Sequence, residues 1–211
     1  MIDPQPNAEL DHLFLFVANR ETAQSMMDAA GLRVNYSRVH PGQGTQNLCA
    51  CLDDVFLELL WLDGSEISPA TERITLGSRG RGEGSPIGVS WRGQSCVQHA
   101  EDGTVPYFAP FLPADVSIPV AAQSLDPTLP FVFQTPGGTP PIERTDGLVG
   151  TRQTPELARL GRCVLSVPDP LAVRELMDPF TEIEVTAGPP GMRLQLLRSD
   201  GTVGRVVDWS R

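Results

Sequence analysis

The sequence predicts an α+β fold in which two βαβββ modules form a cupped, mixed β-sheet. Three observations support this prediction: short apolar strand patterns towards both ends of the chain, a helix pattern after the first strand of each set, and turn signals between the later strands. Because one order of elements occurs twice, the repeat favours this architecture more strongly than any single motif does. A long Pro- and Gly-rich connection separates the two sets.

The first set of elements follows a loose leader, residues 1–9. The apolar run LDHLFLFVA has the length of a strand, and Asn19 then occupies a helix N-cap position. An alternating strand, the turn PGQG, the strand TQNLCACL and the buried strand VFLELLWL complete the β-α-β-β-β order. We assign residues 10–92 to this module, which includes an extra strand in SPIGVSWRG.

The second set occupies residues 156–211. RCVLSV is predicted as a strand, Asp169 caps a short helix, and TEIEV, MRLQLL and GRVVDW supply three more strands. Superposing the first strands of the two modules places Arg162 at the position of His12, and superposing the last strands places Arg205 at that of Glu58. A competing register pairs LELL with LQLL and puts Gln195 opposite Glu58.

The connection, residues 93–155, carries many prolines around short apolar patches. Such spacing is typical of extended edge segments that wrap a core, so we expect one structural domain overall. A connection of this length could act as a lid, and Tyr107 and Phe108 are candidates to cover a cavity.

Composition excludes several partners. A net charge of −10 and a pI of about 4.7 disfavour nucleic acid. No apolar run approaches the ~20 residues that a bilayer span needs, and the N-terminus has no pattern of a secretory signal. We therefore expect a cytoplasmic protein without a membrane partner. The four cysteines have no zinc-ribbon spacing and are expected to be reduced apolar side chains.

The segments LDHLFLFV, HPGQGTQN and FLELLWL resemble the glyoxalase-like domain family of the vicinal oxygen chelate superfamily, best over residues 10–92. In that superfamily, paired βαβββ modules surround a divalent metal, with ligands from the first and last strands of each module. The resemblance implies His12 and Glu58 as metal ligands. The second module departs from the pattern, because Arg162 and Arg205 cannot ligate a metal. A divalent metal and a degenerate, metal-free site are thus both open.

The residues themselves also indicate a site at His12 and Glu58. Glu58 lies in the apolar strand FLELLWL, where an unpaired buried carboxylate would be costly without a cation, a proton or a donor. His12 lies in a similarly apolar strand. Although a lone histidine in such a strand is more often a core residue, we expect the two together to face a functional cavity.

Further polar residues are candidates for substrate contacts. In HPGQGTQN, His40 could act as an acid or base, unless the motif is only a hairpin connector. An Arg beside a Trp suits an anionic or planar ligand, and arginines at the missing ligand positions could bind a carboxylate or phosphate, or pair with Glu58. The candidate substrate-binding residues are Gln43, Gln46, Asn47, Trp91, Arg92, Arg162 and Arg205.

These expectations define three candidate functions. The leading one is a glyoxalase-like small-molecule enzyme of lyase, isomerase or dioxygenase type, in which Glu58 or His40 moves a proton and an anionic substrate is one option. The alternative is a non-catalytic binding protein for an organic acid or drug, with a degenerate metal site. A third is a metal-free isomerase or lyase that uses His40 and Glu58 directly. A monomer and a homodimer are both compatible with the sequence.

Overall fold

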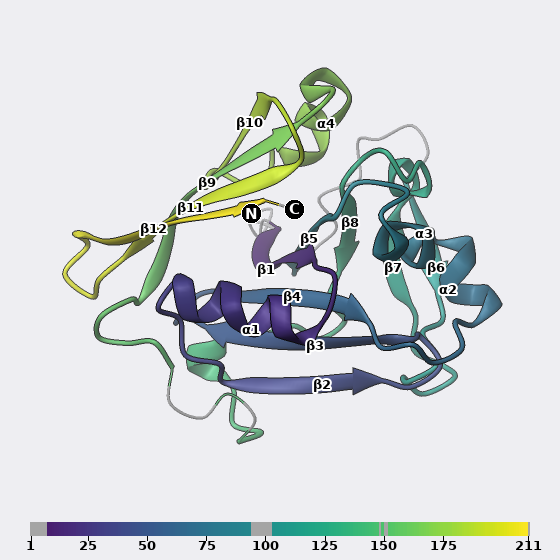
Figure 1. Ribbon diagram of the computed structural model, residues 1–211, viewed down its shortest axis with the longest axis horizontal. Coiled ribbons are helices and arrows are strands. Elements are labelled where there is room, and N and C mark those ends of the chain that lie inside the picture. The colour runs from purple at the N-terminus through teal and green to yellow at the C-terminus, as the bar shows by residue number, and fades with distance from the viewer. Residues whose placement is uncertain (1–7, 94–102, 148, 150–151, 211) are drawn as a thin grey trace, which may run out of the picture.

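The computed structural model describes residues 8–93, 103–147, 149 and 152–210. In this part of the chain the strands form two sheets of mixed orientation, and Figure 1 shows the four-stranded sheet set apart from β2, β3 and β4. The eight-stranded sheet contains β1 (Glu9–Phe16), β2 (Tyr36–His40), β3 (Thr45–Cys51), β4 (Phe56–Leu62), β5 (Ile87–Arg92), β6 (Thr104–Tyr107), β7 (Ile118–Ala121) and β8 (Phe131–Gln134). The predicted α+β class is confirmed.

The remaining elements complete the layout. The four-stranded sheet contains β9 (Arg159–Val167), β10 (Ile183–Ala187), β11 (Gly191–Leu197) and β12 (Val203–Ser210). The helices are α1 (Arg20–Ala29), α2 (Pro69–Arg73), α3 (Leu76–Arg81) and α4 (Pro170–Met177), with 3₁₀ turns η1 (Ala122–Leu125) and η2 (Pro141–Glu143). None of the helices in the described ranges is long and apolar enough to cross a membrane.

The first half of the eight-stranded sheet is the predicted module β1-α1-β2-β3-β4. Its strands lie in the order β2-β3-β4-β1, and β1 runs parallel to β4. Parallel neighbours need a crossover connection, which begins here with α1. The Asn19 side chain caps this helix by accepting a hydrogen bond from the backbone N–H of Thr22 at 2.9 Å.

The second half of the same sheet comes from β5 to β8. These strands lie in the order β5-β8-β7-β6 with β5 parallel to β8, so they repeat the strand order of the first half. An antiparallel pair, β1 with β5, joins the halves. We predicted that residues 156–211 would complete the cup, and the structure uses residues 87–134 instead. Residues 94–102, which include Cys96, lie outside the described residues.

The C-terminal module has the predicted chain order, β9-α4-β10-β11-β12, but a different topology. Its strands lie in the order β10-β9-β11-β12, with β9 parallel to β10 and antiparallel to β11. β12 is therefore not next to β9, whereas β4 is next to β1. Superposing the last strands of the two modules consequently does not identify equivalent positions.

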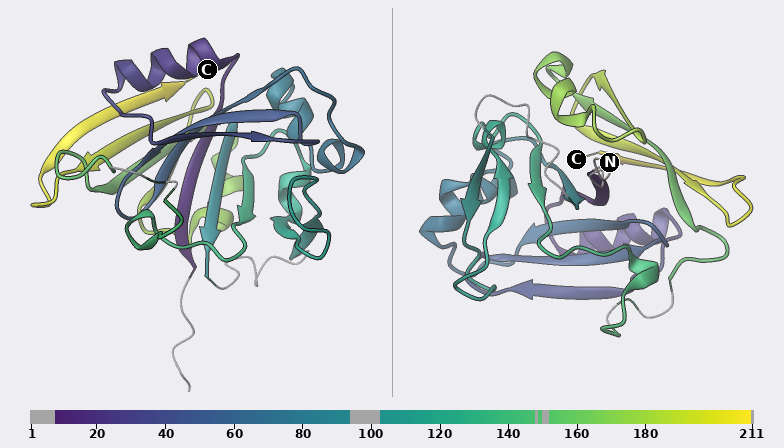
Figure 2. Two further views of the ribbon diagram at one scale, coloured as in Figure 1. Left: turned by 90° about the horizontal axis from the view of Figure 1, so that it is seen from below. Right: turned by 180° about the vertical axis from the view of Figure 1, so that it is seen from behind.

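The two faces of the eight-stranded sheet differ because side chains alternate along each strand. Leu13 and Leu15 of β1 belong to an apolar core that is shared with α1 and the four-stranded sheet. His12 and Phe14 alternate with them and line a cavity on the other face. The right view of Figure 2 shows the four-stranded sheet, green to yellow, above the blue strands β2 and β3.

The described cysteines behave as apolar side chains. Cys49, Cys51 and Cys163 are free and buried. Burial raises the pKa of the Cys51 thiol to about 12, so this thiol stays protonated near neutral pH. These three residues match the expectation of reduced apolar side chains.

Candidate active site

A cavity of about 900 Å³ lies on the face of the eight-stranded sheet opposite the shared core. Residues from both halves of the sheet line it, so the sheet curves around it. The aromatic side chains of its wall include Phe14, Tyr36, Phe56, Phe111, Phe131 and Phe133. A mainly apolar cavity of this size with a few convergent polar groups is typical of a small-molecule site.

Asp11 and His12 both reach this cavity although they are neighbours in β1. The pairing of β1 with β5 shifts by one residue between Leu10 and His12, which is a β-bulge that allows two consecutive side chains to share a face. The Asp11 Oδ1 atom lies 2.7 Å from His12 Nδ1, and both residues are buried. A carboxylate beside Nδ1 favours the proton on that nitrogen and orients the ring.

The other ring nitrogen of His12 faces Glu58 of β4. His12 Nε2 lies 3.5 Å from Glu58 Oε2, and Glu58 Oε1 accepts a hydrogen bond from Asn47 Nδ2 at 2.6 Å. Phe56 stacks on the His12 ring with 4.2 Å between centroids. These contacts hold an imidazole nitrogen and a carboxylate oxygen next to each other at the cavity wall, each only 6% exposed as a residue.

The corresponding positions of the second half carry hydroxyl groups. Ser90 lies directly opposite His12 in the β1–β5 pair. Thr135 lies two residues after Phe133, the β8 partner of Ser90, just as Glu58 lies two residues after Phe56, the β4 partner of His12. Ser90 Oγ lies 2.6 Å from Thr135 Oγ1, which donates to Asp11 Oδ1 at 3.0 Å. A chain of polar contacts therefore runs from Ser90 to Glu58 across both halves.

This set of donors does not fit the divalent metal that the family resemblance implies. Within the described residues, no group of three or more His, Cys, Asp or Glu side chains could hold a metal ion. His12 and Glu58 have suitable ligand atoms, but Ser90 and Thr135 offer neutral hydroxyls that already contact each other. Two ligands hold a divalent ion poorly. Any chemistry at this site therefore relies on the side chains themselves.

The motif HPGQGTQN covers the end of β2, the turn at residues 41–44 and the start of β3. Gly42 and Gly44 have φ angles of 76° and 75°, a left-handed conformation that glycine adopts at little cost. His40 and Gln43 line the cavity and contact the Thr45 hydroxyl at 2.9 and 2.7 Å. Burial lowers the pKa of His40 below its ordinary value of 6.5, so its imidazole is neutral at neutral pH.

Two polar residues of β3 take opposite faces. Asn47 lines the cavity, where its Oδ1 accepts from the Arg38 backbone N–H at 2.7 Å and its Nδ2 donates to Glu58. Gln46 alternates with Asn47, lies outside the cavity lining and is paired with Trp61 of β4. The predicted substrate contact of Gln46 is corrected, because consecutive residues of a regular strand cannot share a face.

Trp91 and Arg92 also lie outside the cavity lining, contrary to expectation. Trp91 is fully buried in the shared core on the opposite face. Arg92 donates from Nε to Glu9 and from Nη1 to the Asp54 carbonyl, each at 3.0 Å, and its Nη1 lies 3.8 Å from Asp11 Oδ2. Arg92 therefore balances the charge of Asp11 from behind the site.

Arg162 and Arg205 lie on the four-stranded sheet, outside the cavity lining. Arg162 pairs with Glu184, and Arg205 donates to the carbonyl of Ala30. Their predicted place opposite Glu58 is corrected, because the C-terminal module is not the second half of the cup. Gln195, from the competing register, is paired with Arg162 in the same sheet.

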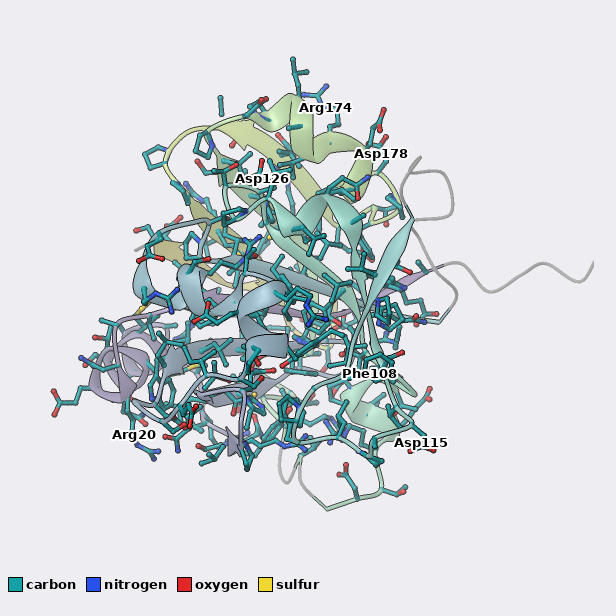
Figure 3. All side chains as sticks on the ribbon, turned by 90° about the vertical axis from the view of Figure 1, so that its right-hand side faces the viewer. Arg20, Phe108, Asp115, Asp126, Arg174 and Asp178 are labelled. Atoms are coloured by element: carbon teal, nitrogen blue, oxygen red, sulfur yellow. The ribbon has the colours of Figure 1, made fainter. Side chains whose placement is uncertain are left out.

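The two edge strands of the large sheet, β2 and β6, are linked by side chains beside the cavity. The Tyr107 hydroxyl donates to Gln43 Oε1 at 3.0 Å, and the Phe111 ring lies 4.9 Å from the ring of His40. Tyr107 lines the cavity as expected, whereas Phe108 is 55% exposed at the surface, where Figure 3 labels it. A lid function of this segment stays a prediction.

Several cavity residues were not predicted from the sequence: Asp11, Thr135, Arg38 and Arg144. Strict alternation puts Asp11 on the face opposite His12, and nothing in LDHLF indicates the bulge. Thr135 follows a short strand in the segment that we interpreted as a connection. Arg38 had a usable signal, since it precedes His40 by two residues in an alternating strand and so shares its face.

The family model of the glyoxalase-like domain matches residues 10–104. No curated protein gives a significant match. Methylmalonyl-CoA epimerase from Mycobacterium tuberculosis is 16% identical, over 64% of this chain and 92% of that chain, with a TM-score of 0.41. A hypothetical protein from Staphylococcus aureus is 11% identical, over 92% of this chain and 82% of that chain, with a TM-score of 0.49. This similarity to the glyoxalase-like domain family covers residues 10–104, which is less than half of the chain.

Proposed function

We propose that this protein is a small-molecule enzyme of lyase or isomerase type that moves a proton between a bound substrate and the pair Glu58–His12. The observation that carries the proposal is the 3.5 Å contact between His12 Nε2 and Glu58 Oε2 at the wall of a largely apolar cavity. Two adjacent ionisable groups in such a place can act as base and acid in one step.

Each neighbour of the pair has a defined task in this mechanism. Asp11 accepts a hydrogen bond from the Nδ1–H group of His12 and stabilises the ring when Nε2 also carries a proton. Asn47 holds one oxygen of Glu58 and leaves the other, Oε2, available to a substrate. Apolar walls exclude water around the reacting atoms and strengthen these charge interactions.

The proton balance closes with these two groups alone. Glu58, as carboxylate, removes a proton from a carbon next to a carbonyl group. Protonated His12 donates its Nε2 proton to the neighbouring oxygen or carbon, or to a leaving group in the lyase case. The proton on Glu58 then returns to His12 Nε2 across their contact, which restores the starting state.

Deuterium exchange tests this proposal. The full chain is incubated in D₂O with aryl ketones, among them 4-acetylbenzoate, whose acidic methyl group and carboxylate lie at opposite ends of the ring, and loss of the acidic C–H signal is followed by proton NMR. We expect exchange above background for at least one member, unchanged by EDTA. Glu58→Gln should slow it about 100-fold or more, because a positioned base contributes on that scale.

Two results would overturn the proposal. One is background exchange for every member of the panel by a folded wild-type chain. The other is exchange that EDTA abolishes and a divalent metal restores, which would return the site to metal-assisted chemistry. Gln195→Glu serves as a matched control. It exchanges an amide for a carboxylate on the four-stranded sheet, outside the cavity lining, and should leave exchange unchanged.

A non-catalytic binding protein is the second candidate. It is favoured by the contact between Ser90 and Thr135, which replaces two ligand positions of the superfamily with hydroxyls that satisfy each other. In that case the same panel should bind to the cavity, raise the melting temperature and show no exchange.

A further inference from the structure

Negatively and positively charged side chains line different parts of the cavity. The carboxylates of Asp11 and Glu58 lie at its inner wall, where these residues are 2% and 6% exposed. Asp11 contacts His12 and lies near Arg92, and Glu58 contacts His12 and Asn47. A second negative charge beside Glu58 would be repelled in a site from which water is largely excluded.

Two guanidinium groups line the same cavity further out. Arg38 of β2 is exposed, and its Cζ lies 5.1 Å from the ring centre of Phe111. Arg144 follows η2, and its Cζ lies 5.8 Å from the ring centre of Tyr36. A guanidinium over an aromatic face is held in place by cation–π attraction while its N–H groups remain available to a ligand.

The two arginines differ in their present partners. Arg144 donates from Nη2 to Asp146 Oδ2 at 2.6 Å. No carboxylate in the described part of the chain forms an ion pair with Arg38. Arg38 is therefore the cation of this wall with the most hydrogen-bonding capacity for a ligand anion. Exposed Glu143 also lines the cavity near Arg144, which makes that side less favourable for an anion.

The spacing between Arg38 and Glu58 sets a length. β2 and β4 are separated by β3, so their backbones lie two strand spacings apart, about 10 Å. Asn47 of β3 spans this interval, because it accepts from the Arg38 backbone and donates to Glu58. Aromatic side chains, among them Tyr36 and Phe56, line the cavity alongside these strands.

We propose that the substrate is an aromatic organic acid whose carboxylate binds Arg38 and whose ring lies against Tyr36 and Phe56. Its reactive carbon then reaches Glu58 at the far end of the molecule. This inference rests on the proposed function for the identity of the reacting end. Repulsion by Glu58 and attraction by Arg38 act in the same direction, so they select one orientation of the bound molecule.

Calorimetric titration with three probes of equal length tests the charge preference. The probes are 4-phenylbutanoate, 4-phenylbutanamide and 4-phenylbutylammonium, which carry a negative, a neutral and a positive end. We expect the carboxylate to bind tightest to the wild-type chain. Arg38→Gln should weaken carboxylate binding about fivefold to tenfold, since a charge-assisted hydrogen bond contributes on that scale, and should leave amide binding unchanged.

Arg193→Gln is the matched control, because it removes an exposed guanidinium of β11 outside the cavity lining and should alter none of the three affinities. Equal binding of amide and carboxylate, a preference for ammonium, failure of all three to bind, or no effect of Arg38→Gln would each overturn the inference. Glu58→Gln should retain carboxylate binding. A retained carboxylate preference without any deuterium exchange would refute the proposed catalysis and leave this inference standing.

Discussion

The two halves of the eight-stranded sheet share one strand order and differ in chemistry. The first half carries His12 and Glu58 at positions where the second half carries Ser90 and Thr135. The first pair consists of ionisable side chains, and the second pair consists of neutral hydroxyls. A duplicated scaffold can therefore hold its ionisable groups in one copy and retain the other as support.

The second half still contributes to the site through position. Thr135 donates to Asp11, and Asp11 orients His12. The Phe133 ring meets the His12 ring edge-on, with 5.3 Å between centroids. The second half of the sheet therefore acts on His12 through these contacts. Loss of one such contact should have a smaller effect than loss of an ionisable group.

The largest expected change comes from making the second half resemble the first. Thr135→Glu adds a carboxylate as a third ligand beside His12 and Glu58, and Ser90→His adds an imidazole as a fourth. We expect the double variant to bind Zn²⁺ at one ion per chain. At a free metal concentration 100 times the dissociation constant, binding should stabilise the fold by about 2.7 kcal/mol.

Metal content by mass spectrometry and melting temperature by calorimetry measure this effect. Adding His12→Ala to the double variant should abolish binding, because it removes one ligand from the same site. Thr135→Glu alone is the fallback, since Thr135 lines the cavity and has room for a longer side chain. If folded variants with a complete ligand set bind no metal, the positions of the two halves are not equivalent.

A smaller effect is expected from Asp11→Asn, which preserves shape and removes the charge beside His12 Nδ1. The amide no longer fixes one tautomer, so deuterium exchange should slow by about 10-fold to 100-fold, a moderate loss compared with the effect known for a catalytic triad carboxylate. Nitrogen chemical shifts of the His12 ring, measured by NMR, should change from one tautomer to a mixture. Thr135→Val is the matched comparison, and it should leave the tautomer and the exchange rate within about threefold of wild type, because it removes a neutral hydroxyl and keeps the Asp11 carboxylate beside His12.

Local patterns were sufficient to predict the first half and its two central residues. The strand around His12 and that around Glu58 are long apolar runs, and the helix between β1 and β2 has an N-cap at Asn19. The family resemblance and the presence of an ionisable side chain in each apolar strand then indicated one cavity for both residues. His40, Gln43 and Asn47 could be assigned to the same end because the turn HPGQGTQN joins two of these strands.

The second half could not be predicted in the same way. Its strands β6, β7 and β8 have four residues each, and Pro106 is paired with Pro119. Proline within a short run argues against a strand, so the segment was interpreted as a connection. The C-terminal module had the stronger pattern, but chain order alone does not determine which strands become neighbours, and that choice decides whether Arg162 faces the cavity.

The smallest effect should appear in the pH dependence of stability, and it again separates the halves. Both described histidines, His12 and His40, lie in the first half. Burial lowers the pKa of His40 below 6.5, so between the folded-state and unfolded-state values the unfolded chain binds the extra proton. The contribution of His40 to stability is therefore fully present above pH 6.5 and is lost as pH falls towards its folded-state pKa.

Urea unfolding of wild type and His40→Gln between pH 5 and pH 8 measures this contribution. The variant should lose less stability than the wild type on acidification, and the difference between the two should be greatest at the acidic end. Gln retains a polar group near the Thr45 hydroxyl, which His40 contacts at 2.9 Å, so the comparison isolates the titration from the loss of packing. Parallel curves for the two proteins would mean that His40 is hydrated and titrates normally, and the first half would then owe its acid sensitivity to other groups.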